Sequence, residues 1–259
     1  MLKLQHNFNL SLDRDYLDHN YDWQAAILVE VGELLEAEGY QWWKKTEVDT
    51  EGIGIELVDI LHFVLSFMIQ TNYNQLSFQN KASGPENQVD PLDFHELAQE
   101  AENFWPSCEE IHSDPERSKI SPFIYTIFEN SGDIASYFLD YLVLAHKYYT
   151  DLEIYQMYLM KNALNKLRQT YGYIDGKYSK LWEYECYLIE DNRVALKILK
   201  QLPADQITVS VIYDALEEYY KNHHKWELSS YFWCLQLSPL LWLMCWRSLS
   251  IIAAEYHHL

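Results

Sequence analysis

The sequence predicts an all-α protein, and three observations support this prediction. About half of the 259 residues (49%) are apolar, so the chain can bury a sizeable core. Glycine and proline are scarce, at eight and seven residues, whereas folds with many strands need frequent turn residues. Apolar side chains recur at helical spacing over several long stretches. We therefore expect a helical bundle, organised as a single domain over residues 1–259.

Two helices are expected in the N-terminal part. The first spans Asp22–Trp43, where Asp22 can cap the helix and Gly39 is a plausible stop signal. The second runs from Ile55 to about Gln70, after a polar link at 46–54. It is apolar nearly all round, which predicts a central position in the fold.

The segment 72–119 has a different character. It contains four prolines and many acidic residues. Long segments of this kind are usually functional loops or linkers. We expect a mobile insertion here, with one short helix around Phe94–Asn103.

Helical periodicity resumes after this insertion. The periodic segments are Phe123–Tyr149, Leu152–Gln169, Val194–Lys200 and Ser210–Asn222. A turn-rich stretch, Tyr171–Gly176, separates the second of them from the third. We expect the C-terminal part, 193–259, to be helical.

The net charge of −20 restricts the partners of this protein. A surface this acidic repels nucleic-acid backbones and anionic membranes, so we expect neither as a partner. The most apolar stretch, Tyr231–Ala254, is interrupted by polar residues and a proline, which favours buried helices over a membrane span. A polyphosphate ligand would need metal ions or a local basic cluster to bind such a protein.

The cysteines and the N-terminus indicate a compartment. Four widely spaced cysteines form no C-x-x-C pair, which is typical of reduced thiols. The first residues lack the apolar run and the cleavage site of a signal peptide. We therefore expect a cytoplasmic protein.

Two pairs of carboxylates interrupt the two N-terminal helices. Glu30 and Glu33 lie three residues apart on the first helix, and Glu56 and Asp59 have the same spacing on the second. Residues three apart share a helix face, so each pair can point in one direction. Both pairs have apolar neighbours, and a buried carboxylate is costly without a compensating cation. Four such groups on adjacent helices would have to bind protons or a metal.

A solvated acidic face is the alternative interpretation of this pattern. It is the better interpretation of one pair alone, and Glu33 with Glu36 fits it equally well. Two pairs in apolar helices, one loop apart, favour a site instead. Oxygen ligands with room for water suit Mg²⁺, which commonly binds one or two carboxylates together with substrate phosphates. The pattern therefore predicts a metal–polyphosphate site.

A local group of basic residues offers the positive charge that a polyphosphate needs. Lys161, Asn165 and Arg168 follow one another at helical spacing and share a face. Further lysines nearby are Lys166, Lys177 and Lys180. A solvated amphipathic helix and a phosphate-binding face both remain open, and the high local density in so acidic a chain makes them equally good interpretations.

These motifs resemble those of the all-α nucleoside triphosphate pyrophosphohydrolase superfamily, which includes the MazG-like enzymes and the dimeric dUTPases. The two carboxylate pairs carry the resemblance to the superfamily. The segments that look like the dimeric dUTPase branch are Leu2–Gln5 with Asn9, Trp42–Lys44, Glu56–Phe63, Lys161–Arg168, Gly172–Tyr173, Tyr178–Trp182 and Glu190–Asn192. They follow the family order as far as about Asn192.

The resemblance implies a role for each matching residue. The metal ligands would be Glu30, Glu33, Glu56 and Asp59. Glu33 would also orient or deprotonate the attacking water. The phosphates and the sugar would be held by Lys161, Asn165, Arg168, Tyr173, Lys180 and Asn192. The uracil edge would be contacted by Gln5 and Asn9, and the pocket would be closed with the help of Trp43 and Lys44.

The implied reaction is hydrolysis of dUTP to dUMP and pyrophosphate, with dUDP as a second substrate. The expected cofactor is Mg²⁺, as two or more ions, with Mn²⁺ as a substitute. The resemblance also implies a homodimer, whose interface would use the surplus aromatic residues.

Three alternatives are kept. A related branch that hydrolyses dCTP as well as dUTP would have the same chemistry. A di-iron bundle would pair Asp59 with His62 and Glu109 with His112, but the second pair lies in the proline-rich insertion. A non-enzymatic acidic helical interaction protein would show no Mg²⁺-dependent stabilisation by nucleotide. We interpret His62 as a core residue that supports Asp59.

Overall fold

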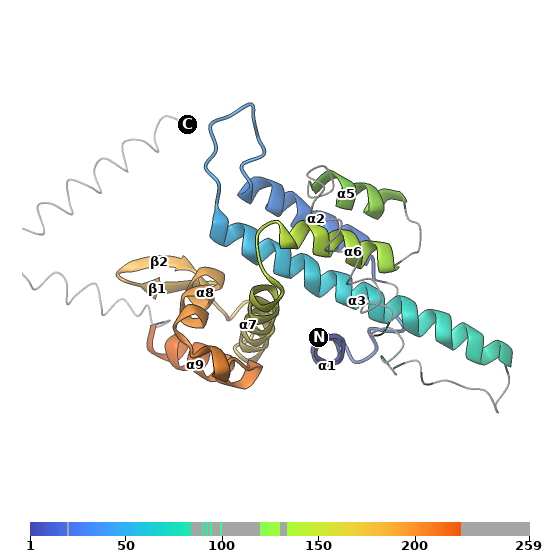
Figure 1. Ribbon diagram of the computed structural model, residues 1–259. Helices are drawn as coiled ribbons and strands as arrows, with labels where there is room; N and C mark the ends of the chain where they lie inside the picture. Colours follow the sequence, from blue (N-terminus) through green and yellow to red (C-terminus); the bar gives the residue numbers. More distant parts are fainter. Residues whose placement is uncertain are drawn as a thin grey trace, which may run out of the picture.

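The computed structural model describes residues 1–19, 21–83, 120–129 and 134–223, together with the single positions 90, 92, 94 and 99. Its helices are α1 (Leu2–Leu12), α2 (Trp23–Ala37), α3 (Thr50–Ser83), α5 (Ile120–Glu129), α6 (Ile134–His146), α7 (Asp151–Thr170), α8 (Asp191–Gln201) and α9 (Val209–His223), with a 3₁₀ turn at Ala204–Gln206. The strands are β1 (Leu181–Tyr184) and β2 (Tyr187–Glu190), the only ones in the described residues. The all-α prediction is therefore confirmed (Figure 1).

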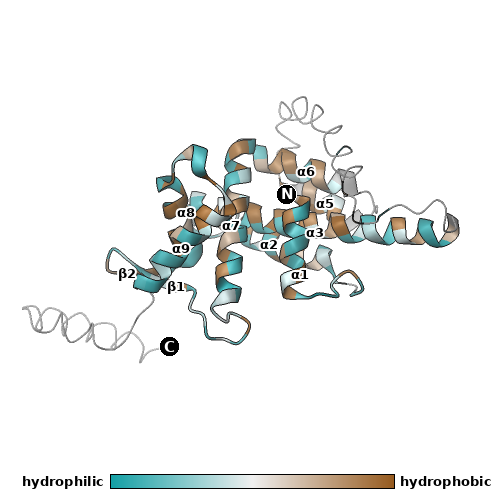
Figure 2. Cartoon of the chain, turned by 90° about the horizontal axis from the view of Figure 1, so that it is seen from below, coloured by the Kyte–Doolittle hydropathy of each residue, from teal (hydrophilic) through white to brown (hydrophobic). Residues whose placement is uncertain are grey.

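The central element is α3, as its apolar sequence predicts. Helices α1, α2, α6, α7 and α8 all pack against it. By length and composition Thr50–Ala82 could cross a membrane, but 78% of its most apolar stretch is buried inside the protein. Its last turns project beyond the other helices and are mostly hydrophilic (Figures 1 and 2). These turns occupy the first part of the segment 72–119, so the expected end of the helix at about Gln70 is wrong.

Local signals set the bounds of α2. Asp22 caps its N-terminus, with a carboxylate oxygen that accepts a hydrogen bond from the Ala25 amide at 2.9 Å. At the other end Gly39 adopts a φ of +67°, a left-handed conformation that glycine adopts without strain. The helix therefore ends at Ala37, and the expected continuation to Trp43 is wrong because the glycine terminates it.

The second half of the bundle begins with α7, which lies between α3 and α9. Thr150 and Glu153 form a capping box at its start. The expected single helix over 123–149 is divided into α5 and α6, with residues 130–133 outside the described part of the chain. The prediction for 152–169 agrees with α7, and that for 210–222 agrees with α9, each to within one residue.

A β-hairpin, which the sequence analysis did not predict, joins α7 to α8. Its strands pair antiparallel, with Leu181 opposite Glu190. Both turn residues, Glu185 and Cys186, have positive φ, as a tight two-residue hairpin turn requires. Trp182 is fully buried and stacks against the ring of Tyr219 on α9, at a centroid distance of 6.0 Å. Trp182 is thus the fully buried contact of the hairpin with the bundle, and a hydrogen bond from the Tyr219 hydroxyl to the Glu183 carbonyl at 2.7 Å adds to it.

We expect Trp182→Ala to lower the free energy of unfolding by about 3–5 kcal/mol, because it empties a large buried volume. Urea unfolding followed by circular dichroism measures this loss. Trp42→Ala is the matched control, since Trp42 is 82% exposed and should change stability by less than about 0.5 kcal/mol. Equal unfolding midpoints for the two variants would show that the hairpin contributes nothing to the core.

Candidate functional site

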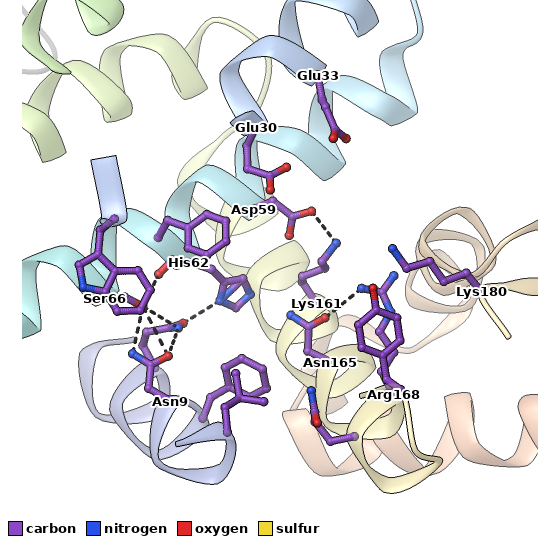
Figure 3. Close-up of a pocket in the computed structure, with 17 residues that line it drawn as sticks. Asn9, Glu30, Glu33, Asp59, His62, Ser66, Lys161, Asn165, Arg168 and Lys180 are labelled. Atoms are coloured by element: carbon purple, nitrogen blue, oxygen red, sulfur yellow. Dashed lines mark hydrogen bonds and ion pairs between the residues drawn. The ribbon is translucent and has the colours of Figure 1, made fainter. Parts of the chain in front are cut away.

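One pocket, with a volume of about 400 Å³, lies between helices α1, α2 and α3 on one side and α7 on the other. Its walls are formed by α1, α2, α3 and α7 and by the loop that leads into β1. In Figure 3 acidic side chains stand at one edge, cationic side chains at another, and amides with a serine and a histidine at a third.

The acidic edge brings together three of the predicted metal ligands. Glu30 and Glu33 on α2 and Glu56 on α3 each offer a carboxylate oxygen, and these oxygens all lie within 4.8 Å of one another. Burial raises the pKa of Glu30 to about 7 and that of Glu56 to about 8, and the charges of Asp59 and Glu33 act in the same direction. Glu30 and Glu56 therefore resist ionising in the absence of a cation.

Asp59, the fourth predicted ligand, is paired with a lysine. Its Oδ2 accepts a hydrogen bond of 2.6 Å from the Lys161 Nζ, and the lysine side chain is only 4% exposed. Lys161 also donates to the Asn192 Oδ1 at 3.0 Å. In Figure 3 Asp59 stands next to Glu30 and gives one oxygen to Lys161 at the cationic edge.

The donor set fits a hard divalent cation. Three carboxylates on two helices, with a fourth one turn along α3, supply only oxygen ligands, which is the preference of Mg²⁺. Burial and, after it, the charges of Asp59 and Glu33 raise the pKa values of Glu30 and Glu56, and a bound cation would offset both effects.

The cationic edge is arranged around Arg168. Its guanidinium donates from Nε and Nη2 to both oxygens of Asp191, at 2.9 and 2.8 Å. The same group donates to the Oδ1 atoms of Asn165 and Asn192, at 3.1 and 3.2 Å. Asp191 is fully buried, and it also accepts from the Tyr178 hydroxyl at 2.8 Å. These bonds hold the guanidinium in one orientation.

Two exposed residues extend the cationic edge. The Nζ of Lys180 lies 5.3 Å from the centre of the Tyr173 ring, and the guanidinium carbon of Arg168 lies 5.8 Å from the same ring. Tyr173 follows Gly172, whose φ of +78° turns the chain back towards the pocket. Lys166 and Lys177 do not line the pocket.

The amide edge is a hydrogen-bonded group on α1 and α3. The Gln5 Nε2 donates to the Asn9 Oδ1 at 2.9 Å and to the Ser66 Oγ at 3.1 Å. The Gln5 Oε1 accepts from His62 Nδ1 at 2.7 Å. All four side chains are buried and line the pocket. Aromatic and aliphatic side chains flank them, namely Phe8, Leu12, Trp23 and Phe63.

The structure brings most of the predicted site residues to this pocket. Those that line it are Gln5, Asn9, Glu30, Glu33, Asp59, Lys161, Asn165, Arg168, Tyr173 and Lys180. Glu56 joins through the carboxylate group, and Asn192 through its bonds to Lys161 and Arg168.

Trp43 and Lys44 do not line the pocket of this single chain, and their role in closing it stays a prediction. Gly39 ends α2 before this segment, and the indole of Trp43 is 64% exposed. His62 differs from expectation, because it bonds to Gln5 at the amide edge and not to Asp59. Glu109 and His112 lie outside the described residues.

Two residues of the site were missed by sequence reasoning. Ser66 follows His62 by one helical turn, and this spacing could have placed it on the pocket face of α3. Asp191 directly precedes Asn192, and an acid at the start of a helix is a recognisable signal. Its pairing with Arg168 depends on the hairpin and had no local signature.

Comparison with known proteins assigns the family. Residues 1–173, about two thirds of the chain, match the family model described as dUTPase. The match includes both carboxylate pairs, the amide edge and Arg168, whereas Lys180 and Asn192 lie beyond it. No curated protein matches the chain. The chain belongs to the dimeric dUTPase family, and it is a nucleoside triphosphate pyrophosphohydrolase with dUTP diphosphatase activity.

Proposed function

We propose that this pocket carries out Mg²⁺-dependent hydrolysis of dUTP to dUMP and pyrophosphate, and that dUDP is a second substrate. The single observation that carries the proposal is that a carboxylate cluster, an amide edge and a cationic edge meet at one pocket. A nucleotide has matching chemistry, with a hydrogen-bonding base at one end and a polyphosphate at the other. Since the family is dimeric, we also propose a homodimer.

The metal would be held by Glu30, Glu33, Glu56 and Asp59, as two or more Mg²⁺ ions for which Mn²⁺ can substitute. Bound Mg²⁺ neutralises phosphate charge and makes a coordinated water more acidic. Glu33 is the most exposed of the three clustered glutamates, so its carboxylate is the one that can orient a water and accept its proton.

The cationic edge binds the phosphate chain. Lys161 and Arg168 present charged donors from positions two turns apart on α7, and Lys180 adds a third from the loop before β1. Asn165 and Asn192 stand beside the guanidinium and hold the remaining phosphate or sugar oxygens. A bound phosphate gives Lys161 a second anionic partner, which leaves Asp59 free to bind metal.

The amide edge binds the base. Gln5 and Asn9 supply hydrogen-bonding groups, and the flanking aromatic side chains supply flat apolar surface for the ring. The Trp43 indole lies outside this pocket in the single chain, so we propose no role for it in base binding.

We expect pyrophosphate release from dUTP with Mg²⁺ and none with EDTA. Glu33→Gln and Asp59→Asn should each lower kcat by about 10²–10⁴-fold, because each removes a charge that the reaction needs. Glu36→Gln is the matched control, since Glu36 lies exposed on the same helix outside the pocket. Undiminished activity of Glu33→Gln would remove the carboxylate cluster from the mechanism. A panel with dCTP, dTTP and UTP tests the base preference.

We also expect a pH-dependent effect of Glu56→Gln on the metal-free protein. The pKa of Glu56 is raised to about 8 by burial and by nearby charges, whereas an unfolded glutamate titrates near ~4.3. The folded state therefore holds the proton over this interval, and stability falls as pH rises through it. Glutamine cannot ionise, so the variant should gain little in Tm over wild type at pH 5 and melt about a few °C higher at pH 8.

Thermal unfolding in EDTA at several pH values measures this difference. Adding Mg²⁺ at pH 8 should reverse the order, since wild type then gains the stabilisation of a bound ligand. A gap in Tm that does not change between pH 5 and pH 8 would contradict the raised pKa. Glu36→Gln should show no such dependence.

A further inference from the structure

A chain of hydrogen bonds at the amide edge has a defined direction. The Ser66 hydroxyl donates to the backbone carbonyl of His62 at 2.8 Å, one turn earlier on α3. Its oxygen lies within hydrogen-bond distance of two amide nitrogens, the Gln5 Nε2 at 3.1 Å and the Asn9 Nδ2 at 3.0 Å. A hydroxyl has one proton and two lone pairs. Because its proton is committed to the carbonyl, Ser66 accepts from both amides.

This commitment fixes which atom of each amide faces which neighbour. The Gln5 nitrogen is turned to Ser66 and Asn9, so its oxygen must face His62 and Tyr158. That oxygen only accepts, and the Tyr158 hydroxyl donates to it at 3.3 Å. The 2.7 Å contact with His62 Nδ1 therefore requires a proton on Nδ1.

The imidazole is held in this tautomer by its surroundings. Complete burial lowers the pKa of His62 to about 4, so the ring is neutral and carries one proton. Its Nε2 is buried without a hydrogen-bond partner in the part of the chain that the structure describes. A proton moved to Nε2 would be a buried donor without an acceptor, and the Gln5 oxygen would lose its shortest bond.

The last member of this chain of hydrogen bonds is Asn9, which lines the pocket. Its Oδ1 accepts from Gln5 at 2.9 Å, and the Ser66 Oγ lies 3.5 Å from it. Because the Ser66 proton goes to the closer His62 carbonyl, one lone pair of this Oδ1 stays available for a ligand. An acceptor at this place suits a base with a ring N–H, as uracil has at N3. Cytosine has a bare acceptor nitrogen at the same position, so two acceptors would face each other without a proton between them.

We propose that His62 is a positioning residue that sets the uracil preference of this pocket, by donating from Nδ1 to Gln5 and thereby fixing the direction of the Gln5–Asn9 amide chain. The inference rests on the proposed function, because it requires the base to bind at the amide edge. It assigns the distinction between dUTP and dCTP to a side chain that need not touch either nucleotide. To reverse the donor–acceptor direction of these hydrogen bonds, the amides of Gln5 and Asn9 and the Ser66 hydroxyl would have to rotate together.

The test compares two nearly isosteric variants, His62→Asn and His62→Leu. The asparagine amide nitrogen is bonded to Cγ, as the histidine Nδ1 is, and so can donate to the Gln5 oxygen. Leucine has a similar volume and no donor. The measured quantity is the ratio of kcat/KM for dUTP to kcat/KM for dCTP, with Mg²⁺ present.

We expect His62→Leu to lower this ratio by about tenfold or more, while His62→Asn keeps it within about threefold of wild type. A purely structural role would lower kcat/KM for both substrates together and leave the ratio unchanged, which would overturn the inference. Ser66→Ala provides a second test with a smaller change in volume. It removes the double acceptor and should also lower the ratio.

These measurements distinguish the role of His62 from the proposed hydrolysis of dUTP. Wild-type hydrolysis of dUTP with an unchanged ratio in His62→Leu and Ser66→Ala overturns the role of His62 and leaves the proposed reaction intact. A wild-type preference for dCTP overturns the direction assigned to the chain. Absence of wild-type turnover with either nucleotide overturns both proposals.

Discussion

Like charges held at close range are the constraint on which the rest of this structure depends. Three carboxylates from α2 and α3 lie within 4.8 Å of one another, and Asp59 stands beside them. Such an arrangement costs stability unless protons or cations compensate it. Without a metal, the pKa values of Glu30 and Glu56 are raised, and Asp59 forms an ion pair with Lys161. The tight packing of α2 on α3 maintains the arrangement.

The cationic edge depends on a buried ion pair between Arg168 and Asp191. Arg168 is almost completely buried, and its partner Asp191 is fully so. A buried ion pair of this kind contributes little net stability, but it leaves each group with few alternative orientations. The hairpin brings Asp191 to this position and also carries Trp182 into the core. The same short element therefore anchors the second half of the bundle and orients the arginine.

Much of the fold and part of the site could be predicted from the sequence. Helical periodicity located α3, α7 and α9, and the carboxylate spacing identified a cluster that the structure assembles. The hairpin escaped prediction because its four-residue strands are too short for a periodic signal, and its turn residues, Glu185 and Cys186, are not typical of positive φ. Contacts between distant residues, such as Arg168 with Asp191, have no local pattern at all. The end of α2 at Ala37, set by the positive φ of Gly39, leaves Trp43 outside the helix that the apolar pattern predicts.

The long helix α3 fixes the distance between two parts of the site. It carries Glu56 of the carboxylate cluster and Ser66 of the amide edge, which are ten residues and hence about 15 Å apart along its axis. Because no joint interrupts this span, the distance and the angle between the two ends are set by helix geometry alone. One inserted residue between them would turn one end by about 100° relative to the other. The relative positions of the metal ligands and the base-binding residues are therefore set by the same helix. An insertion or deletion in α3 between Glu56 and Ser66 would disturb both metal binding and base recognition.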